Sequence, residues 1–172
     1  MVRARQVSQG LGMDDISIRL AQVTDCEAVL SMLKQLATDT GDEDLFRCRT
    51  DDIRKHGFGD QPLFYNLIAA RNDIDLGLAI YHPIFSTTRG MPGVFLLDLW
   101  VSPAARNLGL GKRLIEDVVI RAQQQWQAAY LLLMVHGHNE AAQRFYQRHG
   151  FSHPPHDQYL FLEGDAFQAL SK

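Results

Sequence analysis

The chain has 172 residues, of which 46% are hydrophobic and 22% charged, and its formal net charge is −3. These ordinary values predict one globular domain over residues 15–172 behind a flexible tail of residues 1–14, with Met13 a candidate natural start. The slightly acidic balance predicts no nucleic-acid partner, and no apolar run is long enough to predict membrane association. Cys26 and Cys48 form no metal or redox motif, and they are expected to be reduced thiols in a cytoplasmic protein.

The first half of the chain predicts the element order strand, helix, helix, strand, strand. Strict alternation over residues 16–20 predicts a strand, and Thr24 to Glu27 has the pattern of a capping box that starts a helix. The remaining elements are a short helix over 50–56, a hairpin of strands over 63–71 and 76–82, and a connection over 84–93 that ends in a proline and a glycine.

An acidic loop lies between the two predicted helices. It contains Asp39, Asp42, Glu43 and Asp44. Neighbouring carboxylates raise the local concentration of cations, so this loop could attract a polyamine. The alternative is an ordinary solvated loop.

The second half predicts two buried strands with a helix between them. Residues 94–101 are apolar except for Asp98, and residues 130–135 are apolar throughout, as expected of strands buried on both faces. The intervening helix is expected from about Gly109 to Trp126. A helix over 139–149, a strand over 159–162 and a helix over 165–170 complete the chain. Two such strands joined by a helix predict a parallel pair within an otherwise antiparallel, mixed sheet.

A glycine-rich turn, Arg106 to Lys112, joins the first buried strand to the following helix. Free N–H groups at a helix start and glycines that let a ligand approach the backbone are typical of a phosphate site. Arg106 and Lys112 add full positive charges. A Walker A loop is excluded because Arg106 and Arg113 stand where it needs glycine and serine or threonine, and the dinucleotide fingerprint is excluded because Leu114 replaces its third glycine.

Arg106-x-x-Gly109-x-Gly111 resembles the coenzyme A pyrophosphate loop of the GNAT superfamily of N-acetyltransferases. Residues 139–151, with Asn139, Ala142 and Tyr146 on one helix face, resemble its second signature. The resemblance implies an α/β (α+β) fold with a mixed, mostly antiparallel sheet of six to seven strands, helices on both faces, and a central parallel pair splayed to hold acetyl-CoA. The residues assigned to this cofactor are Leu99, Trp100, Val101, Arg106, Asn107, Leu108, Gly109, Leu110, Gly111, Lys112, Asn139, Ala142 and Tyr146.

Residues 16–170 are further similar to the diamine (spermidine/spermine-like) acetyltransferase branch of this superfamily. The similarity includes Gly77-x-Ala79-x-Tyr81 and Leu97-Asp98-Leu99-Trp100-Val101. It implies a homodimer and a small-molecule amine substrate. The branch usually has Glu-Asp where this chain has Leu97-Asp98, and that glutamate is often assigned to amine binding or deprotonation, so polyamine specificity and the identity of the base are both open.

The resemblance implies direct attack of the amine on acetyl-CoA, with Tyr146 protonating the departing thiolate. The alternative for Tyr146 is a half-buried core aromatic, with Asn139 merely an N-cap. An alkyl amine arrives as ammonium at neutral pH, so its proton must be taken by Asp98, whose pKa burial would raise, by His136, or by a water chain. Asp98 could instead be structural and His136 solvated. Asp157 is a further candidate for binding the amine.

Two other functions remain open. The acceptor could be a protein lysine or N-terminus, or the chain could be a non-catalytic module that binds or senses acyl-CoA. A metal site is not expected, because the pairs His136-x-His138 and His153-x-x-His156 lack a third patterned ligand.

Overall fold

The computed structural model describes residues 15–153, 160 and 162–170. The chain divides into two compact units, Met1–His136 and Gly137–Lys172. The first unit holds the sheet and the helices α1 (Cys26–Thr40), α2 (Thr50–Gly57) and α3 (Leu110–Trp126), and the second holds α4 (Glu140–Arg148) and α5 (Gly164–Ala169). The tail predicted over residues 1–14 lies outside the described residues.

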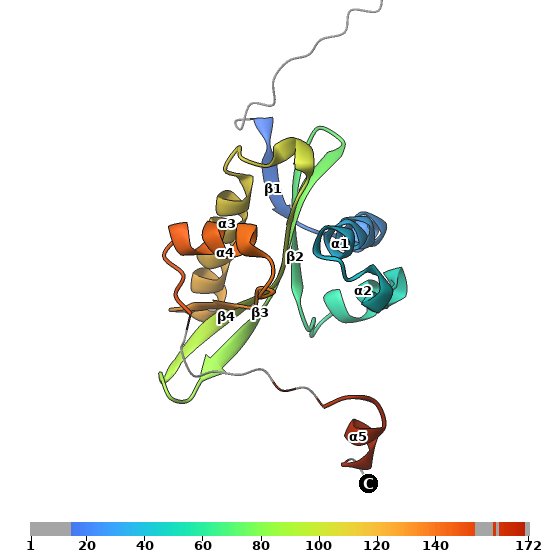
Figure 1. Ribbon diagram of the computed structural model, residues 1–172, viewed down its shortest axis with the longest axis vertical. Helices are drawn as coiled ribbons and strands as arrows, with labels where there is room; N and C mark the ends of the chain where they lie inside the picture. The colour runs from blue at the N-terminus through green and yellow to red at the C-terminus, as the bar shows by residue number, and fades with distance from the viewer. Residues whose placement is uncertain (1–14, 154–159, 161, 171–172) are drawn as a thin grey trace, which may run out of the picture. The chain divides into compact units, whose positions relative to one another are not determined.

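The described residues form one five-stranded sheet in the order β1-β2-β3-β4-β5 (Figure 1). The strands are β1 (Ser17–Leu20), β2 (Tyr65–Arg71), β3 (Ile74–Ser86), β4 (Met91–Val101) and β5 (Leu131–Leu133). All neighbours are antiparallel except β4 and β5, which are parallel. The mixed sheet with one parallel pair is therefore confirmed. The count of six to seven strands is not reached among the described residues, because the last predicted strand falls on 159–162, where Tyr159 and Phe161 lie outside them.

The connection expected over residues 84–93 is mostly strand. β3 runs to Ser86 and β4 begins at Met91, so that Phe85 lies opposite Pro92. The turn is closed by the Gly90 N–H, which donates to the Ser86 carbonyl at 2.8 Å. Proline and glycine are uncommon in strands, which is why they indicated a loop. Here the missing side chain of Gly93 leaves room for the ring of Tyr130, which packs directly over it.

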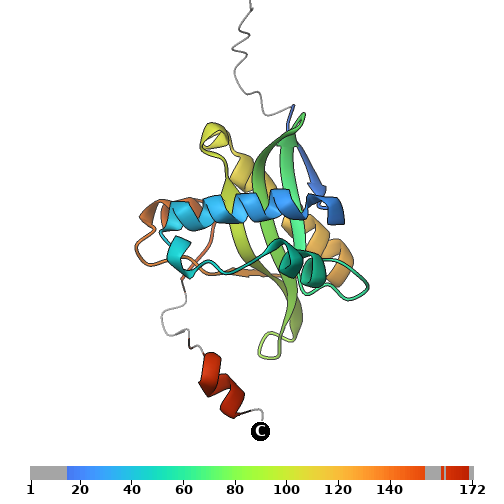
Figure 2. The same ribbon diagram turned by 90° about the vertical axis from the view of Figure 1, so that its right-hand side faces the viewer.

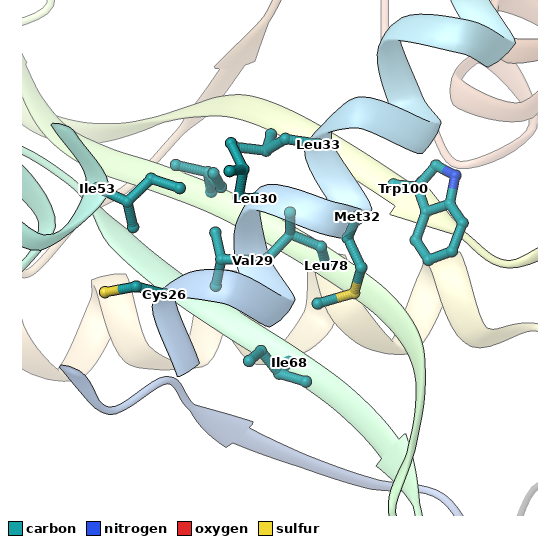
Figure 3. Close-up of a cluster of buried hydrophobic side chains, with 10 residues drawn as sticks. Cys26, Val29, Leu30, Met32, Leu33, Ile53, Ile68, Leu78 and Trp100 are labelled. Carbon is teal, nitrogen blue, oxygen red and sulfur yellow. The ribbon is translucent and has the colours of Figure 1, made fainter. Parts of the chain in front are cut away.

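Helices cover both faces of this sheet, α1 and α2 on one and α3 on the other (Figures 1 and 2). The core under α1 is apolar and includes one aromatic residue from β4 (Figure 3). Its buried members are Cys26, Val29, Leu30, Met32, Leu33, Ile53, Ile68, Leu78, Ile80 and Trp100. The predicted capping box is wrong. The N-cap of α1 is Asp25 rather than Thr24, because the Asp25 carboxylate accepts the Gln22 N–H at 2.6 Å and closes a preceding 3₁₀ turn.

Close packing of α3 on the sheet fixes where its first turn lies. A Cβ atom at Gly77 of β3 would come within 2.9 Å of the Leu114 side chain and 3.2 Å of the Trp100 carbonyl oxygen. Glycine at this position therefore lets the start of α3 approach the sheet beside the end of β4. Among the described residues, no helix has the length and apolarity needed to cross a membrane.

Candidate active site

β4 and β5 pair over only three residues and then separate. The pairing ends at Leu96 and Leu133, whereas β4 continues to Val101. The register with β3 shifts at the same place, since Ile80 lies opposite Asp98 and Tyr81 opposite Leu96. Leu97 is thus the extra residue of a β-bulge, which bends a strand and increases its twist. The bulge accounts for the separation of the parallel pair, and the β4 backbone beyond it has no β5 partner.

The turn after β4 presents backbone donors at the start of α3. Asn107 and Gly109 have φ angles of 63° and 82°. Gly109 is the N-cap and supplies no side-chain cap. Along α3, the first amide that donates a hydrogen bond to the turn is that of Arg113, whose acceptor is the Gly109 carbonyl at 3.2 Å. The amides of residues 107–112 find no acceptor among the described residues, so they are available to an anion.

Both cations of this turn are paired with carboxylates. Arg106 Nη2 contacts Asp39 Oδ2, and Arg106 Nε donates to the Val101 carbonyl at 3.0 Å. Lys112 Nζ lies 2.5 Å from Glu116 Oε1, one helical turn further along α3. The turn therefore offers an anion its amides, while these ion pairs reduce the free positive charge that the sequence indicated.

Asp98 is a partly buried carboxylate at the bulge. Its cross-strand partner Ile80 belongs to the core under α1, so Asp98 faces the same side of the sheet, where it interacts electrostatically with Cys48. The carboxylate accepts no hydrogen bond from the residues that the structure describes. Loss of hydration raises the pKa of Asp98 from 3.8 to about 6. Burial thus shifts the pKa of Asp98 in the direction expected from the sequence. The backbone hydrogen bonds typical of a structural carboxylate are not found among the described residues.

Replacing Asp98 by asparagine is expected to stabilise the protein at pH 7 and not at pH 4. Because the folded-state pKa of Asp98 is raised, its charged form costs folding free energy above about pH 6, and this cost disappears as the pH falls below 3.8. The difference in unfolding free energy between variant and wild type should grow by on the order of 2 kcal/mol across this window. Denaturant unfolding at several pH values measures it, and a difference that does not change with pH would contradict the burial of this carboxylate.

A further polar residue, which the sequence did not indicate, lies in line with Asp98 across the neighbouring strands. Asn66 of β2 lies opposite Ile80, which in turn lies opposite Asp98. Asn66 is only 3% exposed, and neither polar atom of its side chain has a partner among the described residues. A single asparagine in an apolar strand gives no sequence signal that it is buried and unpaired.

The acidic loop is partly engaged in ion pairs. Asp39 pairs with Arg106, and Asp42 Oδ2 lies 3.1 Å from His136 Nε2 and accepts the Thr40 hydroxyl at 2.6 Å. His136 follows β5, and its side chain is half exposed. Two of the four carboxylates therefore have cationic or imidazole partners, which lowers their capacity to attract a free amine.

The sequence profile of the acetyltransferase (GNAT) family matches residues 30–151, which include the separating strands and the glycine-rich turn. The chain belongs to the GNAT acetyltransferase family. Members of this family take the acetyl group from acetyl-CoA.

Two curated relatives of this GNAT chain carry names of amine acetyltransferases. The human spermidine/spermine N(1)-acetyltransferase-like protein 1 is 30% identical over 146 residues, which are 80% of this chain and 21% of that protein. The pig (Sus scrofa) thialysine N-epsilon-acetyltransferase is 30% identical over 62% of this chain and 66% of its own length. The chain thus spans about a fifth of the first relative and just under two thirds of the second.

A solved structure supports the GNAT fold over nearly the whole chain. An integron cassette protein from the mobile metagenome of V. cholerae superposes with a TM-score of 0.77 at 22% identity, covering 94% of this chain and 99% of that one. At this identity the likeness shows the fold alone.

The second GNAT signature forms α4 in the other compact unit. The Asn139 side chain accepts the Ala142 N–H at 3.0 Å, so Asn139 is the N-cap of this helix. The Tyr146 ring packs edge-on against Phe145 and Phe151, with centroid distances of 5.2 and 5.3 Å. These contacts fix the tyrosine on its own unit. Asp157 lies outside the described residues, and among those described no cluster of three or more His, Cys, Asp or Glu is suited to a metal ion.

Proposed function

We propose that this GNAT chain is an acetyl-CoA-dependent N-acetyltransferase whose acceptor is a primary amine of a small, diamine- or polyamine-like molecule. The observation that carries the proposal is the bulge at Leu97, where β4 leaves β5 and leads into a helix start with unpaired amides. An extended thioester needs such an opening between strands, and its pyrophosphate needs such donors. The names of the two curated relatives support an amine acceptor.

The cofactor side of the site consists mainly of backbone. Acetyl-CoA supplies an activated acetyl group as a thioester. The amides of residues 107–112 hold its pyrophosphate, and backbone groups of residues 99–101 bond the pantetheine. Asn139 and Ala142 contribute from α4. The side-chain oxygen Oδ1 of Asn139 already caps the helix, so the side-chain NH₂ group of Asn139 is the group left for the cofactor.

On the acceptor side, the chain must bind an ammonium group and remove its proton. Asp98 is suited to both tasks, because a carboxylate with a pKa of about 6 is charged at neutral pH and still accepts a proton more readily than an ordinary aspartate. His136, held by Asp42, is the second candidate base, and a water chain is the third. Tyr146 donates the proton that the departing thiolate needs. Asp157 is a further candidate carboxylate for binding the ammonium group.

A homodimer and a cytoplasmic location complete the proposal. The dimer rests on the similarity to diamine acetyltransferases. The location rests on the two thiols, since Cys26 is buried and Cys48 partly buried, and neither forms a disulfide.

Release of the CoA thiol from acetyl-CoA against a panel of amines tests the function. The panel contains diamines, spermidine, lysine, an aminoglycoside, an arylamine and a lysine peptide. Turnover is expected with diamines or spermidine, which would also show that Leu97 does not disable the chemistry. Turnover with the peptide alone would contradict the small-molecule acceptor, and binding of acetyl-CoA without turnover of any amine would favour a sensing module.

A further inference from the structure

One carboxylate joins α1 to the end of β4 and to the glycine-rich turn. Asp39 lies in the last turn of α1 and its Oδ2 accepts the Trp100 indole N–H at 2.9 Å. The same oxygen contacts Arg106 Nη2. Arg106 in turn donates through Nε to the Val101 carbonyl at 3.0 Å. Asp39 thus joins the end of α1 to the stretch from Trp100 to Arg106, which lies more than 60 residues further along the chain.

The position of Asp39 is electrostatically costly without its partner. The carbonyl end of a helix carries a partial negative charge, so a carboxylate in the last turn of α1 is unfavourable unless a cation offsets it. Arg106 is that cation. Its rigid, planar fork contacts the carboxylate with one nitrogen and a strand carbonyl with another, which fixes the direction of the side chain in a way that a lysine cannot.

The two ion pairs of the turn differ in what they connect. Lys112 and Glu116 are four residues apart on one helix and both are about half exposed, so their pair holds nothing else in place. Arg106 and Asp39 are 67 residues apart and tie the turn to a different helix. Arg106 is the first residue after the short 3₁₀ helix Pro103–Ala105, directly ahead of the amides that find no acceptor.

We propose that Asp39 is a positioning residue for the acetyl-CoA site. It holds the Arg106 guanidinium against the end of β4, and this contact fixes the turn whose backbone amides receive the pyrophosphate. Arg106 therefore acts through the conformation of the turn, not as a direct phosphate ligand. The inference rests on the proposed function only in taking residues 107–112 as the pyrophosphate site.

The variant Asp39→Asn shows whether Arg106 positions the turn or binds the phosphate directly, because these two roles predict opposite changes in CoA affinity. The variant keeps an acceptor for the Trp100 N–H and loses the charge that holds the guanidinium. Positioning predicts that the Kd for CoA, measured by calorimetry, rises about tenfold. If Arg106 were a direct ligand, the same change would free the guanidinium and remove a nearby negative charge, so the Kd would fall. A fall or an unchanged Kd overturns the proposal.

Further variants show whether Asp39 and Arg106 act together on CoA binding. Arg106→Gln combined with Asp39→Asn should weaken CoA binding no more than either change alone, whereas additive losses contradict a shared role. Arg106→Lys keeps the charge but loses the fork, and it should weaken binding as Asp39→Asn does. Glu116→Gln is the matched control. It frees the other cation of the turn and should leave the Kd within about twofold of wild type.

A kinetic readout distinguishes positioning from general destabilisation. In Asp39→Asn the KM for acetyl-CoA should rise about tenfold, while kcat at saturating acetyl-CoA and the KM for the amine stay within about twofold. A fall in kcat alone overturns the proposal. If wild-type protein fails to bind CoA, the cofactor site and this inference both fall, whereas normal wild-type binding with an unaffected Asp39→Asn variant removes only the inference.

Discussion

Replacing Gly111 by glutamate is expected to abolish CoA binding and leave the fold intact. Gly111 is the second residue of α3, and its amide is one of those that find no acceptor among the described residues. A glutamate there brings bulk and a negative charge to the place proposed for the pyrophosphate. Two like charges about 4 Å apart repel by about 4 kcal/mol near a protein surface, so the Kd for CoA should rise at least about a hundredfold. Calorimetric titration measures the loss.

The fold should tolerate this substitution because glutamate suits the position. It has a higher helix propensity than glycine, and a carboxylate in the first turn interacts favourably with the helix dipole. The melting temperature is therefore expected to stay the same or rise. Gly111→Ala is the matched control, since it adds one methyl group without charge and should weaken binding far less. Normal CoA affinity in the glutamate variant would remove the pyrophosphate assignment of residues 107–112.

Replacing Tyr146 by phenylalanine is expected to lower kcat about a hundredfold with little change in CoA affinity. The substitution removes only the hydroxyl, and the ring contacts with Phe145 and Phe151 remain available. A general acid that protonates the departing thiolate contributes about a hundredfold or more to the rate, and it is not needed to bind the cofactor. Initial rates at saturating substrates give kcat, and calorimetry gives the Kd for CoA.

The alternative for Tyr146, a purely structural aromatic, predicts a different outcome. Loss of the hydroxyl would then leave kcat unchanged or would lower the melting temperature and kcat together. Tyr130→Phe is the matched control, because this second tyrosine packs over Gly93 and beneath Arg89 and has no role in the proposed chemistry. It should turn over like wild type. A Tyr146→Phe variant with wild-type kcat would remove the acid role.

Local patterns predicted most of the elements in the right order. The helix expected from Gly109 to Trp126 is α3, Leu110–Trp126, because a four-residue apolar repeat and a glycine start are both local signals. The capping box at Thr24 failed for a local reason as well, since the helix begins one residue later and the Asp25 carboxylate accepts the Gln22 N–H of the preceding 3₁₀ turn. The strands β3 and β4 extend into the predicted connection over 84–93, and the glycine at position 93 fits a strand because the Tyr130 ring, 37 residues further along the chain, packs over it.

The candidate site depends on contacts that a single sequence does not contain. The sequence shows Leu97 where the similar diamine acetyltransferases have glutamate, but its role as a bulge follows from how β4 pairs with β3 and β5. The pairing of Arg106 with Asp39 joins residues from two distant segments, and no pattern near either residue indicates the other. Backbone-binding motifs leave a local signature, whereas the residues that hold such a motif in place do not.

Acetyl transfer is tested most directly by product analysis after incubation of wild-type protein with acetyl-CoA and a diamine. Mass spectrometry of the amine and thiol assay of CoA are made on the same reaction. Transfer to the amine predicts one acetylated amine for each CoA released, with neither product formed when the amine is omitted. Release of CoA without acetylated amine would mean hydrolysis of the thioester, and this result would contradict transfer to an amine as the function of this GNAT chain.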